Sequence, residues 1–141
     1  MPANFLIDTG ALLAILDRND RWHTVCGEAF SRLRLPALTS EAVLTETSHL
    51  LRRSRTDSEK VWGLRDSGAV IMAEISDNEL PAIRGLMLRY RDLPMDFADA
   101  TLVHLASRED IPAILTVDQA DFSTYRIAGR RRFHVLPAER P

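Results

Sequence analysis

Short apolar segments alternate with amphipathic helical segments along the whole chain. The candidate strands are Phe5–Ile7, Ala37–Thr39, Val70–Ile75, Ile111–Val117 and Arg132–Leu136. Between them, apolar residues recur every three or four positions, as on one face of a helix. Strands separated by helices favour a mostly parallel sheet with right-handed crossovers. The sequence therefore predicts an α/β fold.

Local signals place the helix ends. Predicted helices are Ala11–Leu16, Arg21–Leu33, one from Ser40 to about Arg52, one opened by a capping box at Thr56–Glu59 and stopped by Gly68, one capped by Asp77 and running to Tyr90, Phe97–Ser107, and a short one over Gln119–Tyr125. Ser, Thr and Asp before an apolar-periodic run are typical N-caps, and Gly is a typical helix stop. We find no repeat and no linker, so 1–141 is predicted to be a single domain.

Composition excludes several classes of protein. The 141 residues carry 18 basic and 20 acidic side chains and are 45% hydrophobic, as in an ordinary soluble globule. The net charge of −2 is not that of a strongly basic nucleic-acid binder. The single cysteine, Cys26, excludes an intrachain disulfide and is expected to be a small buried hydrophobe. The longest apolar run, Ala11–Leu16, is too short for a membrane span, so we expect a cytoplasmic protein without membrane contact.

Two acids follow predicted strands directly. Asp8 follows the predicted strand Phe5–Ile7, and Asp118 follows the predicted strand Ile111–Val117. Ligands of open parallel sheets bind outside the carboxyl ends of the strands, which would bring both acids to one edge. The alternative for each is a turn or cap residue, because Asp is common there.

Two further acids lie on predicted helices. Glu46 shares a helix face with Val43 and Leu50, where a charge is costly unless it is paired, bound or partly exposed. Asp99 lies in a first helical turn that Asp96 would cap, among small and apolar neighbours. Four separate structural roles explain Asp8, Glu46, Asp99 and Asp118 less well than one shared site does.

A carboxylate cluster indicates hard cations. The four histidines show no metal-binding spacing, and oxygen ligands favour Mg²⁺ or Mn²⁺ over Zn²⁺. Such ions suit phosphodiester hydrolysis, because they activate water and stabilise charge on a phosphate. Hydroxyls of Thr9 and Thr116 could orient the acids, or could serve only strand-end hydrogen bonding.

These motifs together resemble the PIN-domain family, in particular its VapC-type toxins of toxin–antitoxin systems. The residues that carry the resemblance are Leu6–Leu12, Glu46, Met95–Ala100 and Leu115–Phe122. The resemblance implies a three-layer α/β/α domain with Asp8, Glu46, Asp99 and Asp118 as metal ligands. Asp121 would be a less certain contributor, and Asp96 belongs to a common variant of the motif. It also implies an RNA substrate, an antitoxin partner and a homodimer.

Arginines form two groups in the sequence. Arg52, Arg53 and Arg55 follow the Glu46 helix, and Arg126 and Arg130–Arg132 lie near the C-terminus. They are hypothetical contacts for RNA phosphates, with a solvated charged surface as the alternative. Trp22 and Trp62 could stack on bases, although packing in the core or in a dimer is favoured by their apolar neighbours.

Two rival functions follow from the same motifs. A haloacid-dehalogenase-like phosphatase would need a second Asp two residues after Asp8, and Gly10 stands there. A catalytically inactive PIN-like module that only binds RNA or protein is the second alternative. The complete set of four acids argues against it.

Overall fold

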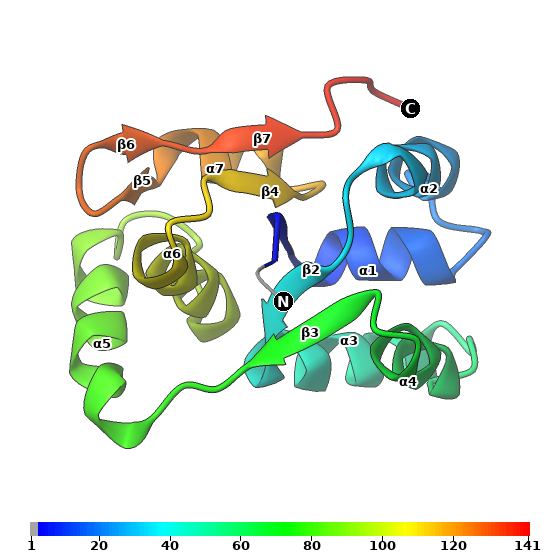
Figure 1. The fold of residues 1–141 in the computed structure, drawn as a ribbon, viewed down its shortest axis with the longest axis horizontal. Coiled ribbons are helices and arrows are strands. Elements are labelled where there is room, and N and C mark those ends of the chain that lie inside the picture. Colours follow the sequence, from blue (N-terminus) through cyan, green and yellow to red (C-terminus); the bar gives the residue numbers. More distant parts are fainter. Residues whose placement is uncertain (1–2) are drawn as a thin grey trace.

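Five parallel strands form the central sheet of the protein, seen in a computed structural model that describes residues 3–141 (Figure 1). Their order across the sheet is β3-β2-β1-β4-β7. The strands are β1 (Phe5–Ile7), β2 (Ala37–Ser40), β3 (Val70–Ala73), β4 (Ala113–Leu115) and β7 (His134–Leu136). Every residue of β1 and β2 is buried, as expected for parallel strands covered on both faces. The predicted α/β class is confirmed.

Helices cover both faces of this sheet. They are α1 (Thr9–Leu16), α2 (His23–Arg32), α3 (Glu41–Arg53), α4 (Glu59–Asp66), α5 (Leu80–Arg89), α6 (Phe97–Glu109) and α7 (Gln119–Thr124). Helices α1 to α4 gather on one side of the sheet, and α5 and α6 lie on the other (Figure 1). The three-layer α/β/α architecture is therefore confirmed. The hydrophobic core contains residues of the sheet and of the helices on both of its faces, with the fully buried strands β1 and β2 in the middle.

The strand order places a reversal of direction beside β1. From β1 the chain moves to β2 and then to β3, and it returns to the other side of β1 only at β4. Strands β1 and β4 are neighbours, with Ile7 paired to Leu115. Such a switch point opens a crevice at the carboxyl ends of the two strands. Asp8 and Asp118 follow these two strands.

Two predicted helix starts differ from the structure. The capping box over Thr56–Glu59 is not formed: Asp57 Oδ1 accepts from the Glu59 amide at 3.0 Å, and the Ser58 side chain makes no cap hydrogen bond. Ser76, not Asp77, caps the next helical segment, and its amide donates to Glu79 Oε2 at 2.8 Å. A 3₁₀ turn, η1 (Asp77–Glu79), then runs directly into α5. Ser76 with Glu79 fits the capping-box pattern as well as Thr56 with Glu59, so local sequence alone could not choose between them.

The C-terminal third contains a hairpin that the sequence pattern missed. Strands β5 (Arg126–Ile127) and β6 (Arg131–Arg132) pair antiparallel around Ala128 and Gly129, which both have positive φ. Two residues per strand are too few for an alternating pattern to be visible. Strand β4 is also shorter than the predicted Ile111–Val117, although the Thr116 amide beyond its end still donates to the Leu136 carbonyl at 2.8 Å.

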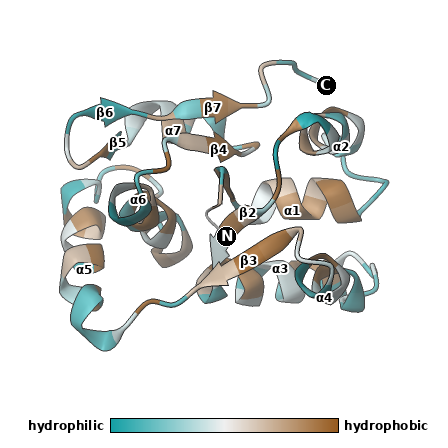
Figure 2. Cartoon of the chain, viewed as in Figure 1, coloured by the Kyte–Doolittle hydropathy of each residue, from teal (hydrophilic) through white to brown (hydrophobic). Residues whose placement is uncertain are grey.

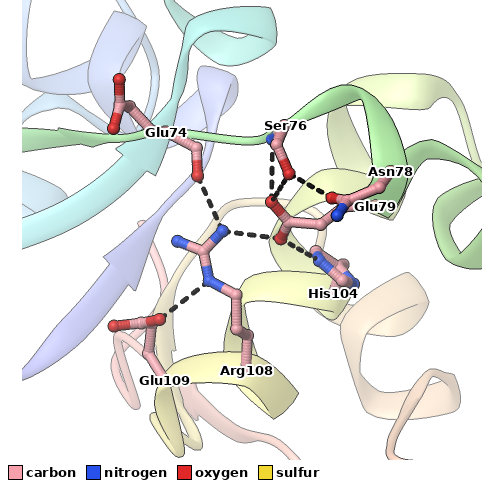
Figure 3. Close-up of polar contacts among 7 residues, drawn as sticks. All are labelled: Glu74, Ser76, Asn78, Glu79, His104, Arg108 and Glu109. Atoms are coloured by element: carbon pink, nitrogen blue, oxygen red, sulfur yellow. Dashed lines mark hydrogen bonds and ion pairs between the residues drawn. The ribbon is translucent and has the colours of Figure 1, made fainter.

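A charged network joins the loop after β3 to helix α6 (Figure 3). Glu79 Oε1 lies 2.8 Å from His104 Nε2 and 2.7 Å from Arg108 Nη1, and Arg108 also donates to the Glu74 carbonyl at 2.7 Å. The hydrogen bond with His104, followed by those from the Ser76 amide and Arg108, holds the pKa of Glu79 well below its usual range. The network therefore fixes α6, the helix that carries Asp99, relative to the sheet.

Two other sequence expectations, for Cys26 and Trp62, can be compared with the structure. Cys26 is fully buried on α2, as predicted. Trp62 on α4 is 45% exposed, so it is not part of the monomer's core. Within residues 3–141, none of the helices combines the length and the apolar character that a membrane crossing requires.

Candidate active site

Asp8 is the most buried acid at the carboxyl edge of the sheet, with 2% of its surface exposed. It is the N-cap of α1, and its Oδ1 accepts from the Ala11 amide at 3.0 Å. The chain can turn this sharply because position 10 is Gly: a Cβ there would lie 2.5 Å from Val117 Cγ2. The turn thus holds the Asp8 carboxylate beside the end of β4.

Thr116 links the two strand ends. Its hydroxyl donates a short hydrogen bond to Asp8 Oδ2 and accepts from the Asp118 amide at 2.9 Å. The Thr116 side chain therefore orients the Asp8 carboxylate and positions the backbone of Asp118. The predicted orienting geometry is present for Thr116. The Thr9 hydroxyl, by contrast, is buried and has no hydrogen-bond partner within residues 3–141.

Helix α6 brings a second pair of acids to the same edge. Asp96 is its exposed N-cap and accepts from the Asp99 amide at 2.9 Å. Asp99 is half-buried in the first turn. The helix start is anchored to the sheet through Thr101, whose hydroxyl lies 2.7 Å from that of Ser40 at the end of β2. Thr101 donates to the Ala98 carbonyl at 2.6 Å, which leaves Ser40 as the donor to Thr101.

Glu46 approaches from the opposite layer. It is half-buried on α3, whose fully buried positions are Val43, Thr47 and Leu51. Asp118 is more exposed, and Asp121 is half-buried in the first turn of α7. The four predicted ligands thus come from both helical layers and from two strand ends.

The charges of these acids act on one another. The pKa of Asp8 is raised to about 7, mainly by burial and also by the charges of Asp118 and Glu46, against the hydrogen bonds from Thr116 and Ala11, which lower it. Burial also raises the pKa of Asp99 to about 8, with contributions from Asp96, Asp8 and Asp118. The pKa of Asp118 is raised by burial and then by Asp121 and Asp96. The acids therefore belong to one electrostatic cluster.

No cation of the described chain neutralises this cluster. Within residues 3–141, no Lys, Arg or His side chain forms an ion pair with any of the acids Asp8, Glu46, Asp96, Asp99, Asp118 and Asp121. Carboxylates that raise each other's pKa without a basic partner favour a proton or a cation nearby. This differs from a structural ion-pair network such as that of Glu79 and Arg108.

The donor set fits a hard divalent cation in chemistry, but its side chains do not converge on one point. Among the described residues, no group of three or more His, Cys, Asp or Glu side chains is arranged to hold a metal ion. Carboxylate oxygens and the unpartnered Thr9 hydroxyl are the ligand types that Mg²⁺ and Mn²⁺ take. A shared ion would require the carboxylates to turn toward one another, so the four-ligand site stays a prediction.

The predicted arginines lie away from the acids. Arg52 and Arg53 end α3, about 10 Å along the helix axis from Glu46 at 1.5 Å per residue. Arg131 pairs with Asp110 at 2.7 Å, and Asp110 caps the end of α6 opposite to Asp99. Arg130 and Arg132 belong to the same hairpin region. RNA contacts by these arginines remain a prediction that the geometry does not place at the acidic edge.

Arg140 is a basic side chain near the fourth acid that sequence analysis missed. It hydrogen-bonds Gln119, the residue after Asp118, and lines a surface hollow of about 510 Å³ with Gln119, Ser123 and Pro137. Its place follows from parallel pairing of β7 with β4, which returns the C-terminal segment to the carboxyl edge. No local motif marks it.

Comparison with known proteins agrees with the fold. The PIN domain family model matches residues 5–128. The chain belongs to the PIN domain family. Among curated relatives, the protein named Ribonuclease VapC26 of Mycobacterium tuberculosis (strain ATCC 25618 / H37Rv) is 31% identical over 134 residues, covering 94% of this chain and 99% of that protein.

A solved toxin structure has the same fold. The crystal structure of Mycobacterium tuberculosis VapC20, described as a sarcin-ricin loop cleaving toxin, superposes with a TM-score of 0.72 at 20% identity. The match covers 78% of this chain and 86% of that one. In this PIN domain, all four candidate acids lie within the matched residues 5–128, whereas Arg130–Arg132 and Arg140 lie outside them.

Proposed function

We propose that this PIN-domain protein is a metal-dependent endoribonuclease that hydrolyses RNA phosphodiester bonds, and that it is the toxin of a toxin–antitoxin pair. The observation that carries the proposal is Asp8. Its carboxylate is buried at the switch point of a parallel sheet, it has no basic partner within residues 3–141, and the charges of Asp118 and Glu46 raise its pKa. A purely structural cap would be neither so buried nor surrounded by like charges.

The proposed metal ligands are Asp8, Glu46, Asp99 and Asp118, with Mg²⁺ or Mn²⁺ as the ion. When bound, such a cation lowers the pKa of the attacking water and stabilises the charge that develops on the phosphate. Thr116 keeps one Asp8 oxygen fixed and leaves the carboxylate's remaining lone pairs available. Asp96 caps α6 and so holds Asp99 at the edge of the sheet, while Thr9 and Asp121 have supporting positions beside the first and fourth acids.

The RNA and protein partners are proposed from the relatives. One is named a ribonuclease and another is described as a toxin that cleaves the sarcin-ricin loop. We propose an RNA substrate, a cognate antitoxin, a homodimer and a cytoplasmic location for this chain, and a single PIN domain over 1–141. Arg140, beside Gln119, is the basic side chain that the geometry offers to a phosphate near Asp118.

RNA cleavage by the purified protein tests the proposal. The parent should cleave RNA with Mg²⁺ or Mn²⁺ and should be inactive in EDTA. Asp8→Asn should lose activity in both metals, because it removes a negatively charged ligand but keeps an oxygen that can cap α1. The matched control is Asp66→Asn, which changes an exposed acid on α4. Equal cleavage by the parent and Asp8→Asn would show that these acids are not the catalytic site, and an inactive parent would favour a binding module.

A further inference from the structure

Tyr125 has a hydroxyl that the fold buries without a hydrogen-bond partner. The residue follows α7 directly, and none of its surface is exposed. Within residues 3–141, the buried hydroxyls without a partner are those of Thr9, Thr47 and Tyr125. Thr9 is already among the ligand types of the acidic edge, and Thr47, inside α3, can turn its hydroxyl to a carbonyl one turn earlier. The Tyr125 phenol, at the end of a rigid ring, has no such local alternative.

An aromatic cluster holds the Tyr125 ring in place. The ring packs edge-to-face on Tyr90, with 5.0 Å between the ring centroids, and on Phe122, with 5.2 Å. Phe122 packs in the same way on Phe133, with 5.4 Å between the centroids. Figure 2 shows α7 and β5, which flank Tyr125 in the sequence, close to the hydrophobic strand β4. A ring packed between two others has little freedom to move, so its hydroxyl points to a fixed place.

The neighbouring tyrosine shows what a purely structural hydroxyl does in this cluster. Tyr90 is the C-cap of α5, and its hydroxyl accepts from the Arg126 amide at 3.0 Å. That hydrogen bond ties the start of β5 to the end of α5. A Phe in place of Tyr125 would pack the same ring without burying an unsatisfied hydroxyl, which destabilises a fold. Core packing alone therefore does not explain why position 125 carries a hydroxyl.

The acidic edge is the charged environment of this hydroxyl. Helix α6, which carries Asp99 in its first turn, packs against β5, and β5 begins directly after Tyr125. Burial raises the pKa of Tyr125 above its usual range, and the charges of four acids raise it further, in the order Asp99, Asp121, Asp96 and Asp118. The hydroxyl therefore keeps its proton and can donate it to a hydrogen bond. The charged groups that act on it are carboxylates, which accept hydrogen bonds.

We propose that Tyr125 is a positioning residue of the acidic edge, and that its hydroxyl donates to the Asp99 carboxylate when that carboxylate holds the metal ion. The inference rests on the proposed metal centre and adds to it a residue that is not a ligand. Asp8 already has such a donor in the Thr116 hydroxyl, whereas no side chain within residues 3–141 donates to Asp99. Hydrogen bonds of this kind orient the carboxylates that bind a metal. Because Tyr125 is fully buried, it acts through Asp99 and does not touch RNA.

Asp99 is the acceptor that the observations favour. Its charge acts on the Tyr125 hydroxyl more strongly than the charge of any other acid does. Asp96 is exposed, and its carboxylate already accepts from the Asp99 amide at 2.9 Å. Asp118 is exposed as well, so water can satisfy its oxygens. The half-buried carboxylate of Asp99 has the greatest need of a donor from inside the protein.

Magnesium titration of the full chain, without RNA, tests this role independently of catalysis. Tyr125→Phe should raise the Mg²⁺ dissociation constant by roughly 10–100-fold, because it removes a hydrogen bond that orients a metal ligand. Thermal unfolding in EDTA should show this variant to be at least as stable as the parent, because it lacks the unsatisfied hydroxyl. Tyr90→Phe is the matched control. It loses the hydrogen bond with the Arg126 amide, so its melting temperature in EDTA should fall while its Mg²⁺ affinity stays that of the parent.

Near-ultraviolet absorbance gives a signature that a merely structural role would not produce. Mg²⁺ should shift the tyrosine absorbance of the parent to longer wavelength, because a phenol that donates a hydrogen bond to a carboxylate absorbs there. The shift should persist in Tyr90→Phe and vanish in Tyr125→Phe. A Tyr125→Phe variant that keeps the parent's Mg²⁺ affinity or its spectral shift would overturn the role of Tyr125 and leave the proposed function intact. A parent that binds no Mg²⁺ would overturn both.

Discussion

Replacing Asp8 with Asn should stabilise the metal-free protein, and the gain should grow with pH. The side chain is 2% exposed, and its pKa rises from 3.8 to about 7 on folding, first because of burial. The folded chain thus binds the Asp8 proton more tightly than the unfolded chain does. Its contribution to stability is fully present below about pH 4 and is lost as the pH rises through about 7.

The magnitude follows from the size of this rise. A pKa that moves from 3.8 to about 7 corresponds to roughly 4 kcal/mol in the free energy of unfolding, at about 1.4 kcal/mol per pH unit. Asn keeps an oxygen for the Ala11 amide, so the α1 cap survives. The Thr116 hydroxyl loses its carboxylate acceptor, which subtracts about 1 kcal/mol or more. We therefore expect Asp8→Asn to exceed the parent by about 2–3 kcal/mol at pH 8 and to be less stable than the parent by about 1 kcal/mol at pH 4, where only the hydrogen-bond loss remains.

Urea denaturation in EDTA across this pH range measures the effect. The two curves of stability against pH should diverge between about pH 4 and about pH 7 and then run parallel, with unchanged m-values. Asp66→Asn, on the exposed surface of α4, should follow the parent throughout. Curves of parent and Asp8→Asn that stay parallel over the whole range, or a parent that is the more stable protein at pH 8, would refute the electrostatic reasoning.

Three other changes test separate parts of the site. Thr116→Val removes the hydroxyl shared by Asp8 and the Asp118 amide. Denaturation should show a fall of about 1–3 kcal/mol in the free energy of unfolding, and titration should show a loss of about 10–100-fold in Mn²⁺ affinity. An unchanged Mn²⁺ affinity would mean that Thr116 does not orient the acids. Gly10→Ala places a Cβ 2.5 Å from Val117 Cγ2, so denaturation should reveal a loss of about 1–3 kcal/mol that Val117→Ala partly restores; no recovery would mean that another strain dominates. Mg²⁺ at about 100 times its dissociation constant should stabilise the parent by roughly 2.7 kcal/mol in a thermal-shift assay, and a full shift in both Glu46→Gln and Asp99→Asn would count against these ligands.

The sequence predicted the layers of the fold better than its edges. Strand and helix order, the Ser40 and Asp96 caps and the stop at Gly68 follow from local chemistry and are present in the structure. The β5–β6 hairpin was missed because two-residue strands carry no periodicity. The sequence also could not show which of the two possible capping boxes forms. The Glu79 side chain beside Ser76 also binds His104 and Arg108, which lie on α6, far away in the sequence.

The candidate site, too, could be predicted from the sequence only in part. Strand ends and a helix first turn predicted Asp8, Asp118 and Asp99, because their positions depend on topology and on capping. Thr116 was predicted from its place before Asp118, and its hydrogen bonds have the expected partners. The arginines could not be placed, since their nearness to the acids depends on the direction of α6 and on where β7 returns the chain. That return brings Arg140, not Arg131, to the acidic edge.

The location of Mn²⁺ in crystals of the metal-loaded protein, read from its anomalous scattering, tests the shared site most directly. We predict a peak at bonding distance from oxygens of Asp8 and of at least two among Glu46, Asp99 and Asp118. A peak elsewhere on the protein, or four carboxylates that remain apart with no ion between them at saturating Mn²⁺, would contradict the proposed metal centre.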